Sequence, residues 1–180
     1  MKIIKAPSKK SWGYIIPALL LIAGALFLSV KSTGGLGGAV GGFLSDGYKS
    51  SGYFSGGKMT EGLDVRTVRW HKHEGYERLV FDIYEWDGVF GDNPYQKTDQ
   101  TGLYQIGKEK SGSLSLDGEL SGYRAFSAKM PSFIKSKRIK RMQVFPNDEN
   151  SFLFTFTLKS PATYKVFTLK NPARIIIDIK

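Results

Sequence analysis

The basic side chains of this chain gather in one stretch, and they are its clearest candidates for binding chemistry. Between Glu119 and Asp148 the sequence holds seven lysines and arginines and no acidic residue, whereas residues 74–119 hold ten acidic and four basic residues. This asymmetry predicts a basic face that attracts anionic polymers or lipid headgroups. A solvated, lysine-rich loop is the alternative interpretation. The residues that we predict to contact an anionic ligand are Lys135, Lys137, Arg138, Lys140 and Arg141.

Three aromatic residues next to expected loops form a second group of candidates. Flat rings pair with the faces of sugars, and Trp70, Tyr76 and Trp86 are therefore candidates for a glycan-stacking platform. Aromatic side chains also close the ends of β-sandwich cores. The sequence alone does not choose between these two roles.

The two histidines raise the question of a metal site. His71 and His73 are spaced to share one face of a strand, where Glu74 or Glu77 would supply a third ligand. A solvated hairpin end explains the same residues, and we predict no metal. The chain has no cysteine, no P-loop, no Rossmann glycine fingerprint and neither a G-x-S-x-G nor an H-E-x-x-H motif. The sequence therefore predicts a protein that is not an enzyme and needs no cofactor.

A nearly repeated hexapeptide, RLVFDI at residues 78–83 and RIIIDI at residues 174–179, is a third place to look for chemistry. In an extended strand, the Arg and Asp of each copy share one face and the apolar residues share the other. An Arg on the same strand would lower the pKa of each Asp, which argues against acid–base catalysis. We predict a duplicated half-domain, with the two strands equivalent in two facing sheets, and coincidence of β-patterning is the alternative.

These candidates must be positioned by strands, because the sequence from about residue 62 onward has a β pattern. VRTVRW and RLVFDIYEW flank a hairpin turn around Gly75, and SFLFTFTLK alternates four large apolar residues with smaller side chains. Short strands separated by turn signals predict an all-β fold, a small β-sandwich of two short sheets over residues 62–180. Residues 130–138 are expected to form a loop or one helical turn.

The N-terminal part of the chain has a different composition. Residues 12–30 carry no charge and are long enough for one transmembrane helix, a signal anchor. Lysines in residues 1–11 predict a basic tail that stays in the cytoplasm. The chain after the helix is then expected to be exported. A cleaved signal peptide is the alternative. Residues 31–61 are rich in Gly and Ser and are predicted to be a flexible linker.

The β-rich part also resembles a known family. Residues 65–83 and 138–179, above all YKVFTLKNPARIIID at 164–178, look like AMIN and AMIN-like domains. Such modules occur in cell-wall amidases, in secretins and in membrane-anchored envelope proteins. The resemblance implies a sandwich of two small sheets, no catalytic centre, and localisation through peptidoglycan or envelope partners. Residues 87–121 look like an insertion relative to the compact form of the domain.

Together these observations predict a non-catalytic bacterial envelope protein, single-pass in the inner membrane, with its N-terminus in the cytoplasm and its C-terminal domain in the periplasm. Its expected partner is peptidoglycan or another anionic envelope polymer, and export argues against nucleic acid. The alternative is an accessory subunit of a larger membrane complex, assembled through the transmembrane helix and the GGLGGAVGG segment at residues 34–42.

Overall fold

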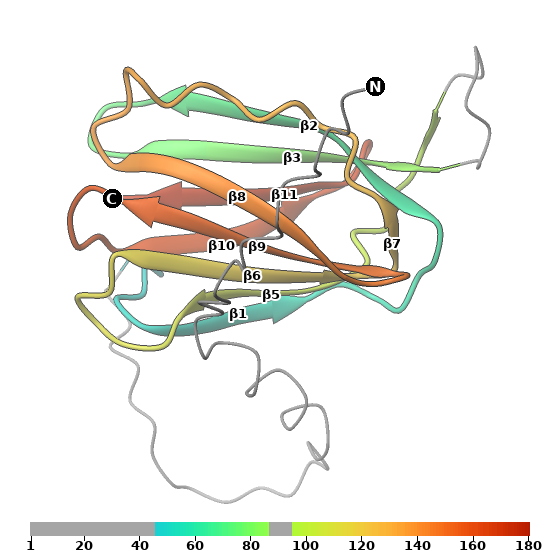
Figure 1. Cartoon of the computed structure of the whole chain (residues 1–180), viewed down its shortest axis with the longest axis horizontal. Coiled ribbons are helices and arrows are strands. Elements are labelled where there is room, and N and C mark those ends of the chain that lie inside the picture. The colour runs from blue at the N-terminus through green and yellow to red at the C-terminus, as the bar shows by residue number, and fades with distance from the viewer. Residues whose placement is uncertain (1–45, 87–94) are drawn as a thin grey trace, which may run out of the picture. The chain divides into compact units, whose positions relative to one another are not determined.

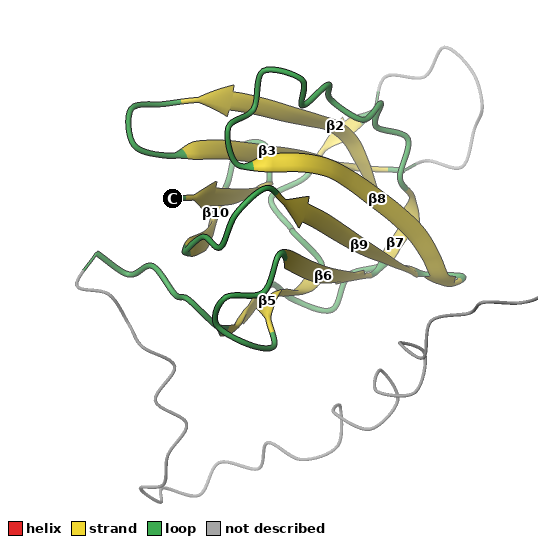
Figure 2. Cartoon of the chain, turned by 60° about the vertical axis from the view of Figure 1, so that its left-hand side comes forward, coloured by secondary structure: helices red, strands yellow, loops and turns green. Residues whose placement is uncertain are grey.

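The computed structural model describes residues 46–86 and 95–180, which all fall in one compact unit that spans residues 39–180. These described residues form strands and loops only (Figures 1 and 2). Residues 46–86 and 95–180 contain no helix long and apolar enough to cross a bilayer. The predicted tail at residues 1–11 and the predicted membrane helix at residues 12–30 lie outside the described residues.

Two sheets face each other, as the predicted sandwich requires (Figure 1). Sheet A has the order β10-β11-β3-β2-β7, with β4 added beside β3, and sheet B has the order β1-β5-β6-β9-β8. The strands of sheet A are β2 (Leu63–Lys72), β3 (Glu77–Glu85), β4 (Gln96–Lys97), β7 (Tyr123–Ala125), β10 (Tyr164–Leu169) and β11 (Arg174–Ile179). The strands of sheet B are β1 (Gly52–Gly56), β5 (Leu103–Lys108), β6 (Ser115–Ser121), β8 (Ile139–Asp148) and β9 (Ser151–Leu158).

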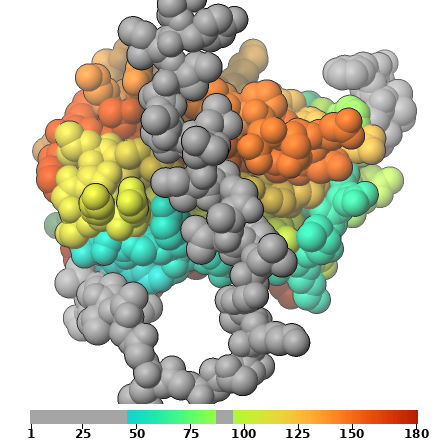
Figure 3. Space-filling view, turned by 60° about the horizontal axis from the view of Figure 1, so that its bottom comes forward, coloured from blue at the N-terminus to red at the C-terminus, as the bar shows by residue number. Residues whose placement is uncertain are grey.

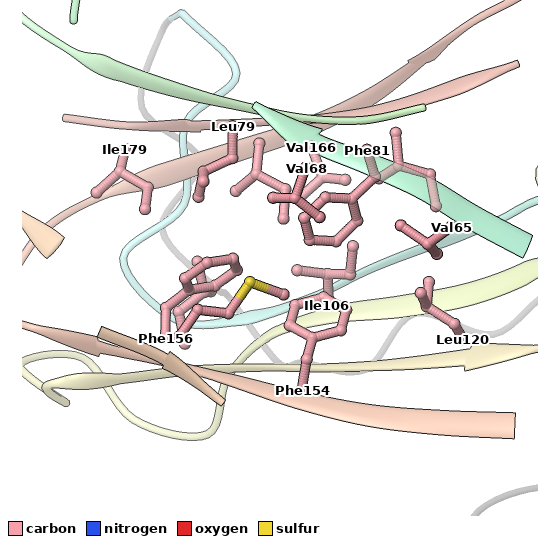
Figure 4. Close-up of a cluster of buried hydrophobic side chains, with 14 of the residues drawn as sticks. Val65, Val68, Leu79, Phe81, Ile106, Leu120, Phe154, Phe156, Val166 and Ile179 are labelled. Carbon is pink, nitrogen blue, oxygen red and sulfur yellow. The ribbon is translucent and has the colours of Figure 1, made fainter. Parts of the chain in front are cut away.

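The core lies between the sheets and follows from the alternation of side chains along each strand. On β9, Phe154, Phe156 and Leu158 are almost completely buried, which confirms the prediction made from SFLFTFTLK. They meet the inward residues of sheet A, among them Phe81 on β3 (Figure 4). The β2–β3 hairpin also forms where predicted, because Gly75 adopts the positive φ of +80° that its turn requires.

Two stretches, one predicted to be a linker and the other an apparent insertion within the domain, contribute strands to the sandwich. Strand β1 lies within the Gly/Ser-rich residues 31–61, yet it pairs with β5 over all five of its residues. Strands β5 and β6 lie within residues 87–121, the apparent insertion, and β6 is the central strand of sheet B between β5 and β9. Residues 46–61 and 103–121 are therefore part of the sandwich.

The two hexapeptides pair with each other, and the prediction that they occupy facing sheets is wrong. RLVFDI on β3 and RIIIDI on β11 are antiparallel neighbours within sheet A. Arg78 lies opposite Asp178, and Arg174 lies opposite Asp82, so the pairing has an approximate two-fold axis between Val80 and Ile176. The local symmetry is that of a strand pair in one sheet, and it does not relate the two halves of the sandwich.

The partners of the two aspartates also differ from the prediction of same-strand arginines. Asp178 accepts two hydrogen bonds from Arg78 on the neighbouring strand, at 2.7 and 2.8 Å. Asp82 accepts from Arg69 on β2 at 2.8 and 2.7 Å, and from the hydroxyl of Thr67. These forked contacts tie neighbouring strands together on the outer face of sheet A. They hold the sheet in register, which is a structural role.

A buried lysine closes one open side of the sandwich, where β10 approaches β5. Lys108 is completely buried, and its Nζ donates to the carbonyl oxygens of Ser113 at 3.1 Å and Ala162 at 2.7 Å. The hydroxyl of Tyr164 accepts a hydrogen bond from the backbone N–H of Lys108 and donates to the carbonyl of Gly52 on β1. Burial lowers the pKa of the Lys108 ammonium, since the charged form is less well solvated there than in water.

We expect the free energy of unfolding of the wild-type protein, measured relative to that of Lys108→Met, to rise with pH in the alkaline range. Because the pKa of Lys108 is lowered by folding, the unfolded chain binds more protons between that lowered pKa and the ordinary lysine value. One such group changes the unfolding free energy by at most about 1.4 kcal/mol per pH unit. Urea unfolding of both proteins across a pH series measures this difference.

Tyrosine ionisation acts in the opposite direction and must be separated from the lysine effect. Burial raises the pKa of Tyr164 to about 12, so the unfolded chain loses this proton first and stability falls as the pH rises. Since the tyrosines are present in both proteins, the difference between the two curves isolates Lys108. A difference that stays flat across the alkaline range contradicts the effect proposed for Lys108.

Candidate anionic-ligand site

Three of the five predicted basic residues sit on the segment that links β7 to β8, residues 126–138, here called the β7–β8 segment. It crosses from sheet A to sheet B and begins along the edge of β2 (Figures 1 and 2). The N–H of Ala128 donates to the carbonyl of Val65 at 3.0 Å, which continues the pairing of β2 beyond β7. The buried carboxylate of Asp64 accepts from the N–H of Ser127 at 2.9 Å and from its hydroxyl. The start of the segment is therefore fixed to β2.

The other end of the β7–β8 segment is fixed by a second buried carboxylate, that of Glu77 at the start of β3. Glu77 is only 2% exposed. It accepts from the N–H of Lys137 at 2.6 Å, from the indole N–H of Trp70 at 3.0 Å, from the N–H of Arg138 at 3.3 Å and from the hydroxyl of Ser136. A carboxylate in this position satisfies donors that would otherwise be buried without a partner.

Apolar contacts reinforce this anchor. Phe133 is buried and meets the ring of Trp70 edge to face, with 6.3 Å between the ring centroids. Earlier in the segment, Phe126 packs edge to face on Phe81 at 6.2 Å. The β7–β8 segment has no regular secondary structure beyond one turn, yet both its ends are built into the core. The basic side chains thus project from a rigid base.

The five predicted basic residues, here called the basic cluster, fall on the end of this segment and on the first residues of β8. Lys135, Lys137, Lys140 and Arg141 are exposed, whereas Arg138 is half-buried. The guanidinium of Arg138 donates to the carbonyl of Gly75 at 3.1 Å, which holds it against the β2–β3 hairpin. Arg138 is therefore partly committed to structure, whereas the other four side chains are exposed to solvent.

A β-bulge at the start of β8 sets the directions of the last two basic side chains. Ile139 pairs with Leu158 and Arg141 pairs with Thr157, so Lys140 is the extra residue between them. The bulge lets both Ile139 and Met142 face the core. Arg141 then lies on the outer face of sheet B, where its Nε donates to the hydroxyl of Thr157 at 3.3 Å. Figure 3 shows a face of the domain that includes the β1 region in cyan, the β6 region in yellow and the β8–β9 region in orange.

Two residues that the sequence analysis missed belong to this site. Lys159 is exposed, its N–H donates to the carbonyl of Arg138 at 2.7 Å, and its ammonium donates to the carbonyl of Ser136. It joins the basic cluster only through the β8–β9 pairing, so the linear sequence contains no signal for it. Glu77 had a signal, because it shares its strand face with Leu79, Phe81 and Ile83 and is thus an acid at an apolar position.

The three aromatic candidates do not form one platform. Trp70 is half-buried against Phe133 and Glu77, and Tyr76 stacks on the ring of His73 at 4.7 Å between centroids. Trp86 follows β3 at its opposite end, and a strand of this length spans about 26 Å. Trp70 therefore packs mainly as a core-closing residue, and Trp86 is separated along β3 from the other two rings.

The two histidines are exposed at the end of the β2–β3 hairpin. His71 lies opposite Arg78, and His73 is covered on one face by Tyr76. Glu77, one of the two carboxylates considered as a third ligand, is directed to the β7–β8 segment instead. Within residues 46–86 and 95–180, no group of three or more His, Asp or Glu side chains is arranged to hold a metal.

An open polar hollow of about 520 Å³ lies near the end of β3 that is remote from Glu77. Its walls include Glu85, Asp99 and Asn171, and the N–H of Asn171 donates to Asp99 at 3.1 Å. None of the predicted site residues line it. The basic cluster on its fixed support is therefore the feature that best fits a binding role.

Comparison with known proteins identifies the family of the domain. The family model of the AMIN-like domain matches residues 63–180, about two thirds of the chain. Searches among curated proteins and among solved structures found no match. AMIN-like domains are generally non-catalytic binding or localisation modules associated with the cell envelope, and no catalytic family is indicated. The chain belongs to the AMIN-like domain family, with the matched residues forming all of the β-sandwich except β1.

Proposed function

We propose that this domain binds an anionic polymer of the bacterial cell wall, peptidoglycan in the first place, through the basic cluster. The observation that carries the proposal is the support of that cluster. Exposed cations project from a segment that two buried carboxylates, Asp64 and Glu77, fix to sheet A. The backbone beneath these cations is already fixed and loses little conformational freedom when the side chains meet a polymer, which favours binding.

The charge of the site and the family of the domain both support this choice of partner. The chain has a formal net charge of +10, and its AMIN-like domain suggests an association with the cell wall or envelope. The wall of bacteria is rich in carboxylates, which are the natural counter-ions of exposed lysines. Attraction of this kind is long-ranged and weakens with salt.

In this proposal, residues 12–30 anchor the chain in the inner membrane and leave the sandwich in the periplasm. The run has no charged residue, whereas four lysines precede it. An anchor restricts the domain to a shell near the membrane and so raises its effective concentration at the wall. The protein would then act without catalysis, by holding its polymer or its envelope partners in place.

Co-sedimentation with purified peptidoglycan sacculi, measured across a salt series, tests this proposal. The fragment must span residues 39–180, because a fragment that starts at residue 58 would lack β1. We expect binding that weakens as salt increases. The triple variant Lys135→Gln, Lys137→Gln and Lys140→Gln should bind about tenfold more weakly, since three exposed contacts at about 0.5 kcal/mol each give that factor.

The matched control removes the same charge elsewhere. Lys58, Lys97 and Lys170 are all exposed and lie outside the basic cluster, so their triple change to Gln lowers the net charge equally. If the control variant loses as much binding as the cluster variant, the interaction depends on total charge and the assigned site is wrong. If the wild-type fragment fails to sediment even at low salt, wall binding is excluded and an accessory role in a membrane complex becomes the better explanation.

A further inference from the structure

The most protruding apolar side chain of the domain lies in the middle of its basic residues. Ile134 is 89% exposed, more than any other large hydrophobic residue among those described. The N–H of Ser136 donates to the carbonyl of Phe133 at 3.0 Å, which closes a four-residue turn with Ile134 and Lys135 at its tip. Phe133 and Ser136 are both buried. The turn therefore stands on a buried base and presents an aliphatic side chain to the outside.

The exposure of Ile134 is imposed by the fold. Phe133 is held by Trp70, and Ser136 is held by Glu77, so the residues on either side of the tip cannot turn to bury Ile134. Met130, 41% exposed, is a second apolar group on the same segment. An isoleucine side chain left in water forgoes the stabilisation that burial would provide. A partner that buries this side chain recovers part of that free energy.

The charges around the tip indicate what kind of partner this is. Lys129, Lys135 and Lys137 are exposed on the same segment, which contains no acidic residue. The neighbouring hairpin carries Glu74 and Glu77, and the carboxylate of Glu77 is buried and occupied by the segment itself. A hydrated wall polymer offers an aliphatic side chain only small, scattered apolar groups. The headgroup region of an anionic bilayer, in contrast, accepts an apolar tip and places lipid phosphates at the level of the surrounding lysines.

We propose that the Phe133–Ser136 turn is a contact site for anionic lipid bilayers, in which Ile134 and Met130 enter the headgroup region while Lys129, Lys135 and Lys137 meet lipid phosphates. This contact goes beyond wall binding, because Ile134 has no part in attracting a polymer. It would orient the sandwich on the membrane surface with the β2–β3 hairpin and the start of β8 toward the lipid.

Flotation with lipid vesicles tests the proposal on the fragment of residues 39–180, which lacks residues 12–30 and so reports on the domain alone. We expect the fragment to bind vesicles that contain phosphatidylglycerol and to bind pure phosphatidylcholine vesicles much less. Ile134→Ser should weaken binding to the anionic vesicles by about tenfold, which corresponds to about 1.4 kcal/mol. Leu169→Ser is the matched control, since Leu169 is 42% exposed on β10 at the opposite edge of sheet A.

A direct readout of insertion comes from Ile134→Trp. The fluorescence emission of this variant should shift to shorter wavelength with anionic vesicles and stay unchanged with phosphatidylcholine alone.

Sacculus binding of Ile134→Ser should equal that of the wild type, so the lipid contact and the proposed wall function can be disproved separately. The proposal is overturned if Ile134→Ser and Leu169→Ser bind vesicles equally well, or if anionic vesicles leave the emission of the Ile134→Trp variant unchanged. Failure of the wild-type fragment to bind vesicles also overturns the proposal. The partner of Ile134 would then be an apolar pocket on another protein.

Discussion

We expect Glu77→Ala to lower the free energy of unfolding by about 3–5 kcal/mol, because several buried donors lose their common acceptor. The indole N–H of Trp70, the hydroxyl of Ser136 and the N–H of Lys137 all donate to the Glu77 carboxylate. Alanine leaves these groups buried and unpaired, and a small cavity forms beside them. Urea unfolding at neutral pH measures the change.

Two controls separate the loss of this acceptor from a general effect on the hairpin. Glu77→Gln keeps one acceptor oxygen at the same place. It should therefore lower the free energy of unfolding by only about 1–2 kcal/mol. Glu74→Ala removes an exposed carboxylate from the same hairpin and should change stability by less than about 0.5 kcal/mol. A Glu77→Ala variant as stable as Glu74→Ala would show that the carboxylate does not anchor the segment.

The same substitution should also release the basic cluster from its support. In Glu77→Ala, hydrogen exchange at the N–H groups of Lys137 and Ile139 should become faster, since the first loses its acceptor and the second depends on the position of Ser136. Under conditions where the variant remains folded, its sacculus binding should fall although every lysine and arginine is still present. This result would link the buried anchor to the proposed function.

Phe81→Ala is the second change for which we expect a large effect, a loss of about 3–5 kcal/mol. The ring of Phe81 lies 5.3 Å from that of Phe154 and 6.3 Å from that of Phe156, and Phe126 packs on it at 6.2 Å. It thus joins sheet A to sheet B and to the β7–β8 segment. Removing it leaves a cavity that the surrounding strands cannot close.

Thermal or urea unfolding measures this effect, with Phe145→Ala as the control. Phe145 is 48% exposed on the edge strand β8, so its truncation should cost less than about 1 kcal/mol. The comparison uses the same chemical change at a core position and at a surface position. If both variants lose the same stability, the aromatic contacts around Phe81 do not dominate the packing between the sheets.

The sequence by itself was sufficient to predict the class of the fold and its local elements. Alternation along β9 identified the buried face that holds Phe154 and Phe156, and the turn signal at Gly75 identified the β2–β3 hairpin. These properties depend on residues close together in the chain, since a strand has a period of two and a tight turn spans only a few residues. The charge asymmetry that marked the basic cluster is likewise visible without any structure.

Only the tertiary structure decided which strands are neighbours and what supports the candidate site. The pairing of β3 with β11 joins residues about 100 positions apart, and alternating patterns are alike in every half-buried strand, so the sequence does not choose the partner. For the same reason the sequence did not reveal that β1 completes sheet B, that Lys159 joins the basic cluster or that Glu77 holds the β7–β8 segment. A single local pattern is compatible with many pairings, and only the packing of the whole sandwich selects one.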